Sequence, residues 1–116
     1  MTQNWRVHLT ERAERDLEEI AGWTTENFGR RQALQYSETI ALALEALASG
    51  PEVPGVRTRD ELAPGVRSLH AALQGRRARH LVLFRVIDHG ILEVLRVLHD
   101  SMELARHLPG VEDSSH

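Results

Sequence analysis

The sequence contains no cysteine and no lysine, and it has few aromatic residues. The lack of cysteine excludes disulfide bonds, thiolate catalysis and cysteine-ligated zinc. All 14 basic residues are arginine, so Schiff-base chemistry and a phosphate-loop lysine are excluded as well. Aromatic residues make up 4% of the chain, too few for a platform that stacks single-stranded nucleic acid. The remaining composition, 41% apolar and 27% charged, is ordinary for a globular domain.

Long apolar runs are also missing. No stretch of the 116 residues approaches the length of a transmembrane helix, and the N-terminal residues MTQNWRVHLTERAERD lack the apolar centre of a signal peptide. We therefore expect a cytoplasmic protein without membrane contact. Its length suits one domain, predicted over residues 1–108, followed by a polar, disordered tail at 109–116.

Charge is distributed unevenly along the chain. Residues 10–49 carry four arginines and eight acids, a net charge of −4, whereas residues 56–87 carry seven arginines and two acids, a net charge of +5. A positive region raises the encounter rate with negative molecules. The second region therefore favours an acidic partner, either protein or nucleic acid.

Two helices are predicted in the first half of the chain. Apolar residues recur at helical spacing after Thr10, a good N-cap, and this pattern ends at Phe28-Gly29. A second helical pattern covers about 30–49, and its apolar face includes Tyr36, which we assign to the core. Because the connection is short, the helices should form an antiparallel hairpin.

Strands are expected on both sides of this hairpin. The alternating WRVHL (5–9) predicts a short N-terminal strand, and the Pro- and Gly-rich segment 50–65 predicts a loop. A short helix, MELARHL, follows the last strand. The remaining strands form a three-stranded antiparallel sheet over 66–73, 80–87 and 91–98. The predicted fold class is therefore α+β.

The last two strands should form a hairpin around Asp88-His89-Gly90. A three-residue loop would place Arg85 opposite Glu93, a favourable ion pair, and Val82 opposite Arg96, whereas a two-residue loop would exchange the faces. Arg96 itself has no evident partner in the sequence.

Both strands are apolar at nearly every position, so both faces of the sheet need cover. Two helices are too few to cover both faces, which indicates a partner chain on the second one. The set expected to face the helices is Leu81, Leu83, Ile87, Leu95 and Val97. The set expected on the other face is Val82, Phe84, Val86, Leu92, Val94 and Leu98.

Candidate chemistry is sparse. The seven histidines lack metal-ligand spacing, so no metal and no cofactor are predicted. RNA cleavage remains an alternative, because it needs proton carriers and cations for the phosphate charge. The candidate proton carriers are His70, His80 and His99, and the candidate cations are Arg67, Arg79, Arg85 and Arg96. We interpret Arg76 and Arg77 as turn charges that keep the hairpin soluble.

Six segments of the sequence resemble the ParE/RelE superfamily of toxins, which belong to type II toxin–antitoxin pairs. They are LTERAERDLEEI (9–20), ENFGRRQALQY (26–36), PGVRSL (64–69), RHLVLFRV (79–86), LEVLRVLHDSME (92–103) and ARHL (105–108). RHLVLFRV followed by EVLRVLHDSM resembles the ParE branch in particular. Phe84 stands where this family often has tyrosine and Glu103 where it often has aspartate. The basic turn QGRRAR is longer than usual.

The resemblance implies a toxin that poisons DNA gyrase by binding and is held inactive by an antitoxin, ParD-like, with an acidic C-terminal segment. It implies a hetero-oligomer of toxin and antitoxin, without sequence-specific binding of nucleic acid. The residues expected to contact a partner are Arg67, Arg79, Phe84, Arg85, Arg96, His99 and Met102.

Two alternatives stay open. A RelE-like endoribonuclease acting on the ribosome would use His99 with Arg96, Arg85 and His80. A decayed toxin would only bind its antitoxin. The first would be an enzyme, whereas a gyrase poison needs no active site of its own.

Overall fold

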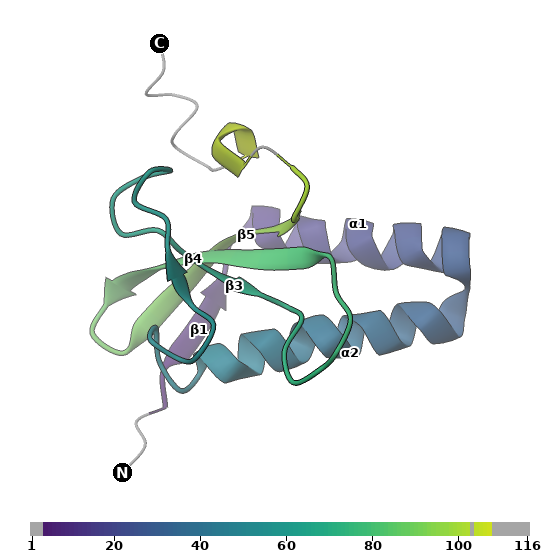
Figure 1. The fold of residues 1–116 in the computed structure, drawn as a ribbon, viewed down its shortest axis with the longest axis horizontal. Helices are drawn as coiled ribbons and strands as arrows, with labels where there is room; N and C mark the ends of the chain where they lie inside the picture. The colour runs from purple at the N-terminus through teal and green to yellow at the C-terminus, as the bar shows by residue number, and fades with distance from the viewer. Residues whose placement is uncertain (1–3, 103, 108–116) are drawn as a thin grey trace.

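The computed structural model describes residues 4–102 and 104–107, and it places a helical hairpin against a mixed sheet (Figure 1). The α+β fold class is confirmed, as are both helices and their antiparallel arrangement. The elements in chain order are β1 (Arg6–Leu9), α1 (Glu11–Phe28), α2 (Arg30–Leu47), β2 (Arg57–Thr58), β3 (Arg67–His70), β4 (His80–Asp88), β5 (Ile91–His99) and the 3-10 helix η1 (Leu104–His107). The expected disordered tail lies outside the described residues.

The sheet has five strands, in the order β1-β5-β4-β3-β2, where three had been expected. The N-terminal strand joins this sheet by pairing in parallel with β5, and the two-residue β2 extends the opposite edge. The three central strands are antiparallel, as predicted. Within the described residues, the C-terminal helix has 3-10 geometry over Leu104–His107.

The helical hairpin follows from a few local residues. The Thr10 hydroxyl accepts a hydrogen bond from the Ala13 backbone at 3.0 Å, which confirms Thr10 as the N-cap of α1. Gly29 alone separates the two helices, and its φ of 88° is a conformation that residues with a side chain rarely adopt. Among the described residues, neither helix combines the length and hydropathy that crossing a membrane requires.

The β4–β5 hairpin contains two irregularities that the sequence did not reveal. The turn has two residues, because Asp88 pairs with Ile91, and Ile87 is left out of the register. Arg85 nevertheless lies opposite Glu93, as predicted. Further along, Leu95 is bulged out of β5. The prediction that Val82 faces Arg96 is therefore wrong, since Val82 pairs with Val97.

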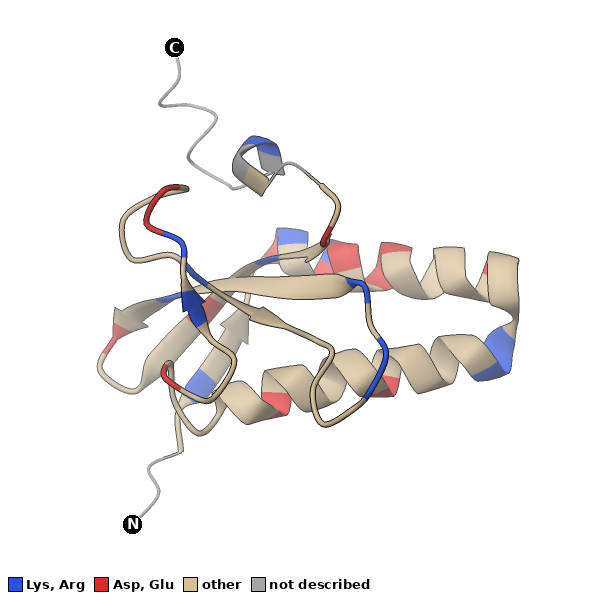
Figure 2. Ribbon diagram, viewed as in Figure 1, with Lys and Arg blue, Asp and Glu red and all other residues tan. Residues whose placement is uncertain are grey.

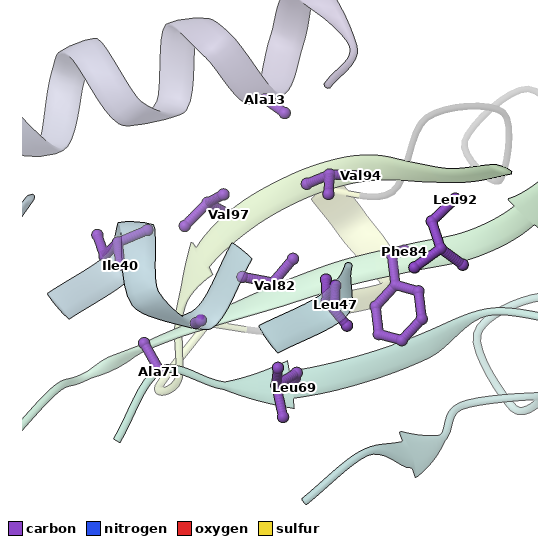
Figure 3. Close-up of a cluster of buried hydrophobic side chains, with 11 residues drawn as sticks. Ala13, Ile40, Leu47, Leu69, Ala71, Val82, Phe84, Leu92, Val94 and Val97 are labelled. Carbon is purple, nitrogen blue, oxygen red and sulfur yellow. The ribbon is translucent and has the colours of Figure 1, made fainter. Parts of the chain in front are cut away.

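The main core lies between the sheet and the helical hairpin (Figure 3). The sheet residues on this side include Val82, Phe84, Leu92, Val94 and Val97, which pack with Ala13 of α1 and Ile40, Ala43 and Leu47 of α2. The predicted assignment of faces is therefore wrong for most of these residues. Strands that are apolar on both faces carry no sequence signal that orients them.

The opposite face of the sheet is covered by the chain itself. Its buried residues are Val66, Leu81, Leu83, Leu95 and Leu98. Leu62 and Ala63 of the Pro- and Gly-rich segment 50–65 and Leu104 of η1 pack against them. A partner chain is thus not needed to bury this face, and the reasoning that inferred a partner from it does not hold.

Candidate functional site

The helical hairpin runs roughly along β4, and its tip projects beyond the start of this strand (Figure 1). Between this projecting half and the start of β4 lies a cleft of about 1180 Å³. We call it the hairpin cleft. Trp23 and Phe28 line it from α1, Arg77 and Arg79 from the turn before β4, and Met102 from the segment after β5.

Tyr36, His80 and His99 line the hairpin cleft, and His80 contacts both of the others. The Tyr36 hydroxyl lies 2.6 Å from Nδ1 of His80, and the backbone N–H of Arg79 donates to the same hydroxyl at 2.9 Å. His80 and His99 are paired across β4 and β5, with ring centroids 5.2 Å apart in an edge-on arrangement. The assignment of Tyr36 to the core is therefore incomplete, because its polar end faces functional groups.

Burial holds two of these groups in their neutral forms. It lowers the pKa of His80 to about 4, and the nearby His99 contributes to the decrease. Burial also raises the pKa of Tyr36. Near pH 7 the Tyr36 hydroxyl can therefore donate a hydrogen bond to Nδ1 of a neutral His80, which requires the tautomer that carries hydrogen on Nε2.

Asp100 joins a histidine and an arginine at the edge of this site. Its carboxylate lies 2.9 Å from Nε2 of His70 and accepts from Nε of Arg79 at 3.1 Å. The hydrogen bonds from His70 and Arg79 lower the pKa of Asp100. Arg79 is thus held by an internal carboxylate although its side chain is 69% exposed.

Arg96 has the partner that the sequence could not identify. Its Nε and Nη2 donate to the two carboxylate oxygens of Asp16 at 2.7 and 2.9 Å, and both side chains are buried. The backbone N–H of Val97 donates to the same carboxylate at 3.0 Å. This bidentate pair fixes α1 to β5 at the base of the hairpin cleft.

Some of the candidate site residues predicted from the sequence line the hairpin cleft, and the others lie elsewhere. The cleft gathers Arg79, His80, Arg96, His99 and Met102. Arg85 lies near the other end of β4, where it donates to Glu93 at 3.0 and 3.2 Å. Phe84 is fully buried, and Arg67 donates to the carbonyl of Pro51.

Sequence reasoning missed Trp23 and Phe28, which form an edge-on aromatic pair with ring centroids 5.7 Å apart. They are 59% and 63% exposed, although both are large and apolar. A usable signal existed for Trp23, which stands outside the apolar stripe of α1, whereas Phe28 falls in line with that stripe at the end of the helix. Large apolar residues at such positions indicate an interaction surface when they cluster.

Arginines gather in the turn before β4 (Figure 2), and two of them, Arg76 and Arg77, have different roles. Arg76 donates to the Thr39 hydroxyl at 3.0 Å and to Glu38 at 3.2 Å, so it ties the turn to α2. Arg77 is exposed and lines the hairpin cleft. Within residues 4–102 and 104–107, no three His, Asp or Glu side chains are grouped closely enough to hold a metal ion.

Known proteins resemble this chain in both sequence and fold. The family model described as the ParE toxin of the type II toxin–antitoxin system parDE matches residues 7–104. A Mycobacterium tuberculosis protein named Toxin ParE1 is 35% identical over 103 residues, covering 89% of this chain and 97% of its own length. A Caulobacter vibrioides protein of the same name is 33% identical, covering 86% and 94%.

Solved structures agree with this fold. The M. tuberculosis toxin–antitoxin complex RelBE2 contains a chain that is 26% identical, with a TM-score of 0.54 and coverage of 83% and 98%. The chromosomal ParDE system from P. aeruginosa gives a TM-score of 0.64 at 24% identity, with coverage of 84% and 97%, which supports the fold alone. Because the family model spans most of the chain and the relatives match it nearly end to end, the protein belongs to the ParE family of toxins of type II toxin–antitoxin systems.

Proposed function

We propose that this toxin acts in the cytoplasm by binding and inhibiting DNA gyrase, and that a cognate antitoxin, ParD-like, holds it inactive. The protein is then a binding poison, and its surface rather than an active site carries the function. The ParE-branch residues RHLVLFRV and EVLRVLHDSM are the first support for this target. The fold alone does not separate gyrase from the ribosome.

The pairing of the strand arginines is the observation that carries the proposal. An RNase of this type needs cations that can take up charge on a phosphate in the transition state. Arg79, Arg85 and Arg96 are each held by a carboxylate of the same chain, namely Asp100, Glu93 and Asp16. An incoming phosphate would have to break these pairs. The arrangement therefore favours a binding protein over a nuclease.

A specific observation also favours the second candidate, the ribosome-dependent endoribonuclease. Tyr36, His80 and His99 lie together in an open cleft, and a neutral histidine can act as a general base. However, the low pKa of His80 makes its protonated form rare near pH 7, which weakens it as a general acid. The nuclease thus has proton carriers, but three of its candidate cations, Arg79, Arg85 and Arg96, are each paired with a carboxylate.

An antitoxin partner is supported by two independent observations. The first is that the structural relative from M. tuberculosis, at 26% identity, comes from a toxin–antitoxin complex. The positively charged segment 56–87 would attract an acidic, partly disordered chain. The corresponding gene should lie beside the toxin gene and encode a DNA-binding N-terminus with an acidic tail.

The proposal is tested with purified, antitoxin-free protein in two parallel assays. One follows supercoiling by DNA gyrase, and the other follows cleavage of ribosome-bound mRNA. We expect supercoiling to be blocked and the mRNA to stay intact. Cleaved mRNA with unaffected supercoiling would establish the nuclease instead. Failure in both assays, with no growth arrest on induction, would indicate a decayed toxin that only binds its antitoxin.

A further inference from the structure

We propose that the basic turn QGRRAR (74–79) and α2 form a binding site for the phosphate group of a small phosphorylated molecule. The site is a pocket of about 460 Å³, which we call the turn pocket. Arg76 and Arg77 line it from the turn, and Tyr36 and four polar residues line it from α2. The proposal goes beyond the inhibition of gyrase, which gives this turn no role.

The turn pocket adjoins the hairpin cleft but differs from it in chemistry. Gln32, Tyr36 and Arg77 line both, whereas the remaining residues of the turn pocket belong to it alone. Its lining contains none of the Trp, Phe and Met side chains that line the cleft. A mostly polar lining suits a charged, hydrogen-bonding ligand rather than an apolar one.

Arg76 is held against α2 by two contacts. Its Nη1 donates to the Thr39 hydroxyl at 3.0 Å, and its Nη2 donates to Glu38 at 3.2 Å. The Thr39 side chain is itself fixed, because it is buried and donates to the Gln35 carbonyl at 3.1 Å. A guanidinium carries five N–H groups, and these contacts use two of them. The others are available to ligand oxygens, with little side-chain freedom left to lose.

Arg77 supplies positive charge that the chain leaves unmatched. Its side chain is exposed, and within residues 4–102 and 104–107 its guanidinium forms no hydrogen bond or ion pair. The side-chain amides of Gln32 and Gln35 likewise have no partner in this part of the chain. Guanidinium groups bind phosphate oxygens in a bidentate manner, and amide NH₂ groups donate to further oxygens. The donors therefore match the several acceptor oxygens of one phosphate group.

The turn keeps its shape through an unusual backbone conformation. Gln74 has a φ of 53°, and it is the only non-glycine residue of the described chain with a positive φ. Gly75 follows with a φ of 79°, and the Arg76 N–H donates to the Leu73 carbonyl at 3.0 Å. Because a side chain makes this conformation unfavourable, residues that adopt it often belong to functional sites. The turn thus presents its arginines to α2 at some cost in backbone strain.

The charges around the pocket favour one phosphate group over a nucleic acid chain. Its three ionised side chains are Arg76, Arg77 and Glu38, two positive charges and one negative. Glu38 is 65% exposed, and Glu45 lies further along the same helix. A polyanion that continued along α2 would be repelled by both carboxylates. A pocket of this volume, within the range of roughly 300–1,000 Å³ typical of small-molecule sites, also has room for an organic group beside the Tyr36 ring.

Calorimetric titration of the purified, antitoxin-free toxin tests the assignment. The probes are inorganic phosphate, AMP and adenosine at millimolar concentration, in a buffer of physiological ionic strength that screens weak surface attraction. We expect phosphate and AMP to bind saturably and to compete for one site, and adenosine not to bind. Tighter binding of AMP would assign the site to phosphate esters, and equal affinities would assign it to the free ion. Adenosine that binds as tightly as AMP, or no saturable binding of either phosphate probe, would overturn the proposal.

Matched variants locate the site. Arg77→Gln should weaken AMP binding by about tenfold or more, because it removes a charged donor to the phosphate. Its control is Arg57→Gln, which removes an exposed arginine of β2 outside the pocket and should leave the affinity unchanged. Glu38→Gln should tighten binding by roughly threefold, because it removes the acid that competes for Arg76. Its control, Glu45→Gln, should have no effect.

The controls separate a specific site from general attraction of anions. Equal weakening in both arginine variants, or equal tightening in both glutamate variants, would show that net charge governs binding and would reject the turn pocket. Circular dichroism checks that the variants are folded, which is expected because all four side chains are exposed. A parallel titration uses a short single-stranded RNA. RNA binding without any binding of AMP or phosphate would assign the turn to nucleic acid and reject the inference.

Discussion

Asp16 and Arg96 are 80 positions apart in the sequence and form a bidentate, buried ion pair with N–O distances of 2.7 and 2.9 Å. The pair connects the first helix to the last strand. Because a third hydrogen bond comes from the Val97 backbone, the carboxylate is well satisfied in the folded state. The pair specifies where α1 sits on the sheet and forms the base of the hairpin cleft.

Substituting Asp16 should therefore strongly lower the free energy of unfolding. Asp16→Ala leaves the Arg96 guanidinium buried without its carboxylate, and we expect a loss of roughly 3–5 kcal/mol in the free energy of unfolding. Urea denaturation measures this loss. The control is Glu19→Ala on the same helix, whose exposed ion pair with Arg12 should contribute at most about 1 kcal/mol. Equal losses in the two variants would show that burial of the pair is unimportant.

The Arg85–Glu93 pair provides the contrasting case. It joins opposite residues of β4 and β5, with side chains 52% and 25% exposed. We expect Arg85→Ala to lower the free energy of unfolding by roughly 0.2–1 kcal/mol, because exposed cross-strand pairs contribute little. The loss should shrink as salt is added. A loss that is independent of ionic strength would argue against an electrostatic origin.

His80 should make stability depend on pH. In the unfolded chain its pKa is near 6.5, whereas burial lowers it to about 4 in the folded state. Between these values the unfolded state binds the additional proton, so the free energy of unfolding decreases as the pH falls from about 6.5 to 4. His80→Gln should flatten this part of the profile.

Chemical denaturation across this pH range measures the effect. Asp100 affects stability at lower pH, because its pKa in the folded state lies below the ordinary value of 3.8. Its effect therefore falls below the pH range in which His80 acts. A profile that has the same slope in the wild type and in His80→Gln would contradict the assignment. Nuclear magnetic resonance titration of the His80 ring gives an independent value of its pKa.

Gly29 should be intolerant of substitution because it alone links the helices at a φ of 88°. We expect Gly29→Ala to lower the free energy of unfolding by about 1 kcal/mol or more. Gly22→Ala is the matched control, since Gly22 lies inside α1 with no atom within 4 Å of an added Cβ. It should raise stability by roughly 0.5–1 kcal/mol. Thermal unfolding measures both effects. Midpoint temperatures that shift in the same direction in the two variants would contradict this account.

Local signals in the sequence were sufficient for much of the fold. The Thr10 cap, the helical spacing after it and Gly29 predicted the hairpin, since each acts through neighbouring residues. The pairing of Arg85 with Glu93 was also predicted, but from a three-residue turn that the structure does not have. The shorter turn and the unpaired Ile87 compensate for each other, so this pair is kept.

The predictions that were wrong or incomplete concern contacts between segments that are distant in the sequence. The Leu95 bulge shifts the register of Val82, and the bulge is supported from outside the hairpin, because the Thr10 hydroxyl donates to the Leu95 carbonyl at 3.0 Å. Asp16 resembles an ordinary solvent-facing acid on α1 until the sheet brings Arg96 beside it. Likewise, Tyr36 has helical spacing typical of a core residue, and only the position of His80 gives its hydroxyl a role.

The central claim is that the toxin acts by binding gyrase rather than by cleaving RNA. The most direct measurement compares growth arrest and DNA damage after inducing the wild type or a His80→Gln, His99→Gln double variant without antitoxin. The double variant lacks both histidines of the cleft, so a nuclease that uses them would lose its toxicity. We predict that the folded double variant still arrests growth and causes DNA damage. Loss of arrest in a folded double variant, with mRNA cleavage present only in the wild type, would contradict the account.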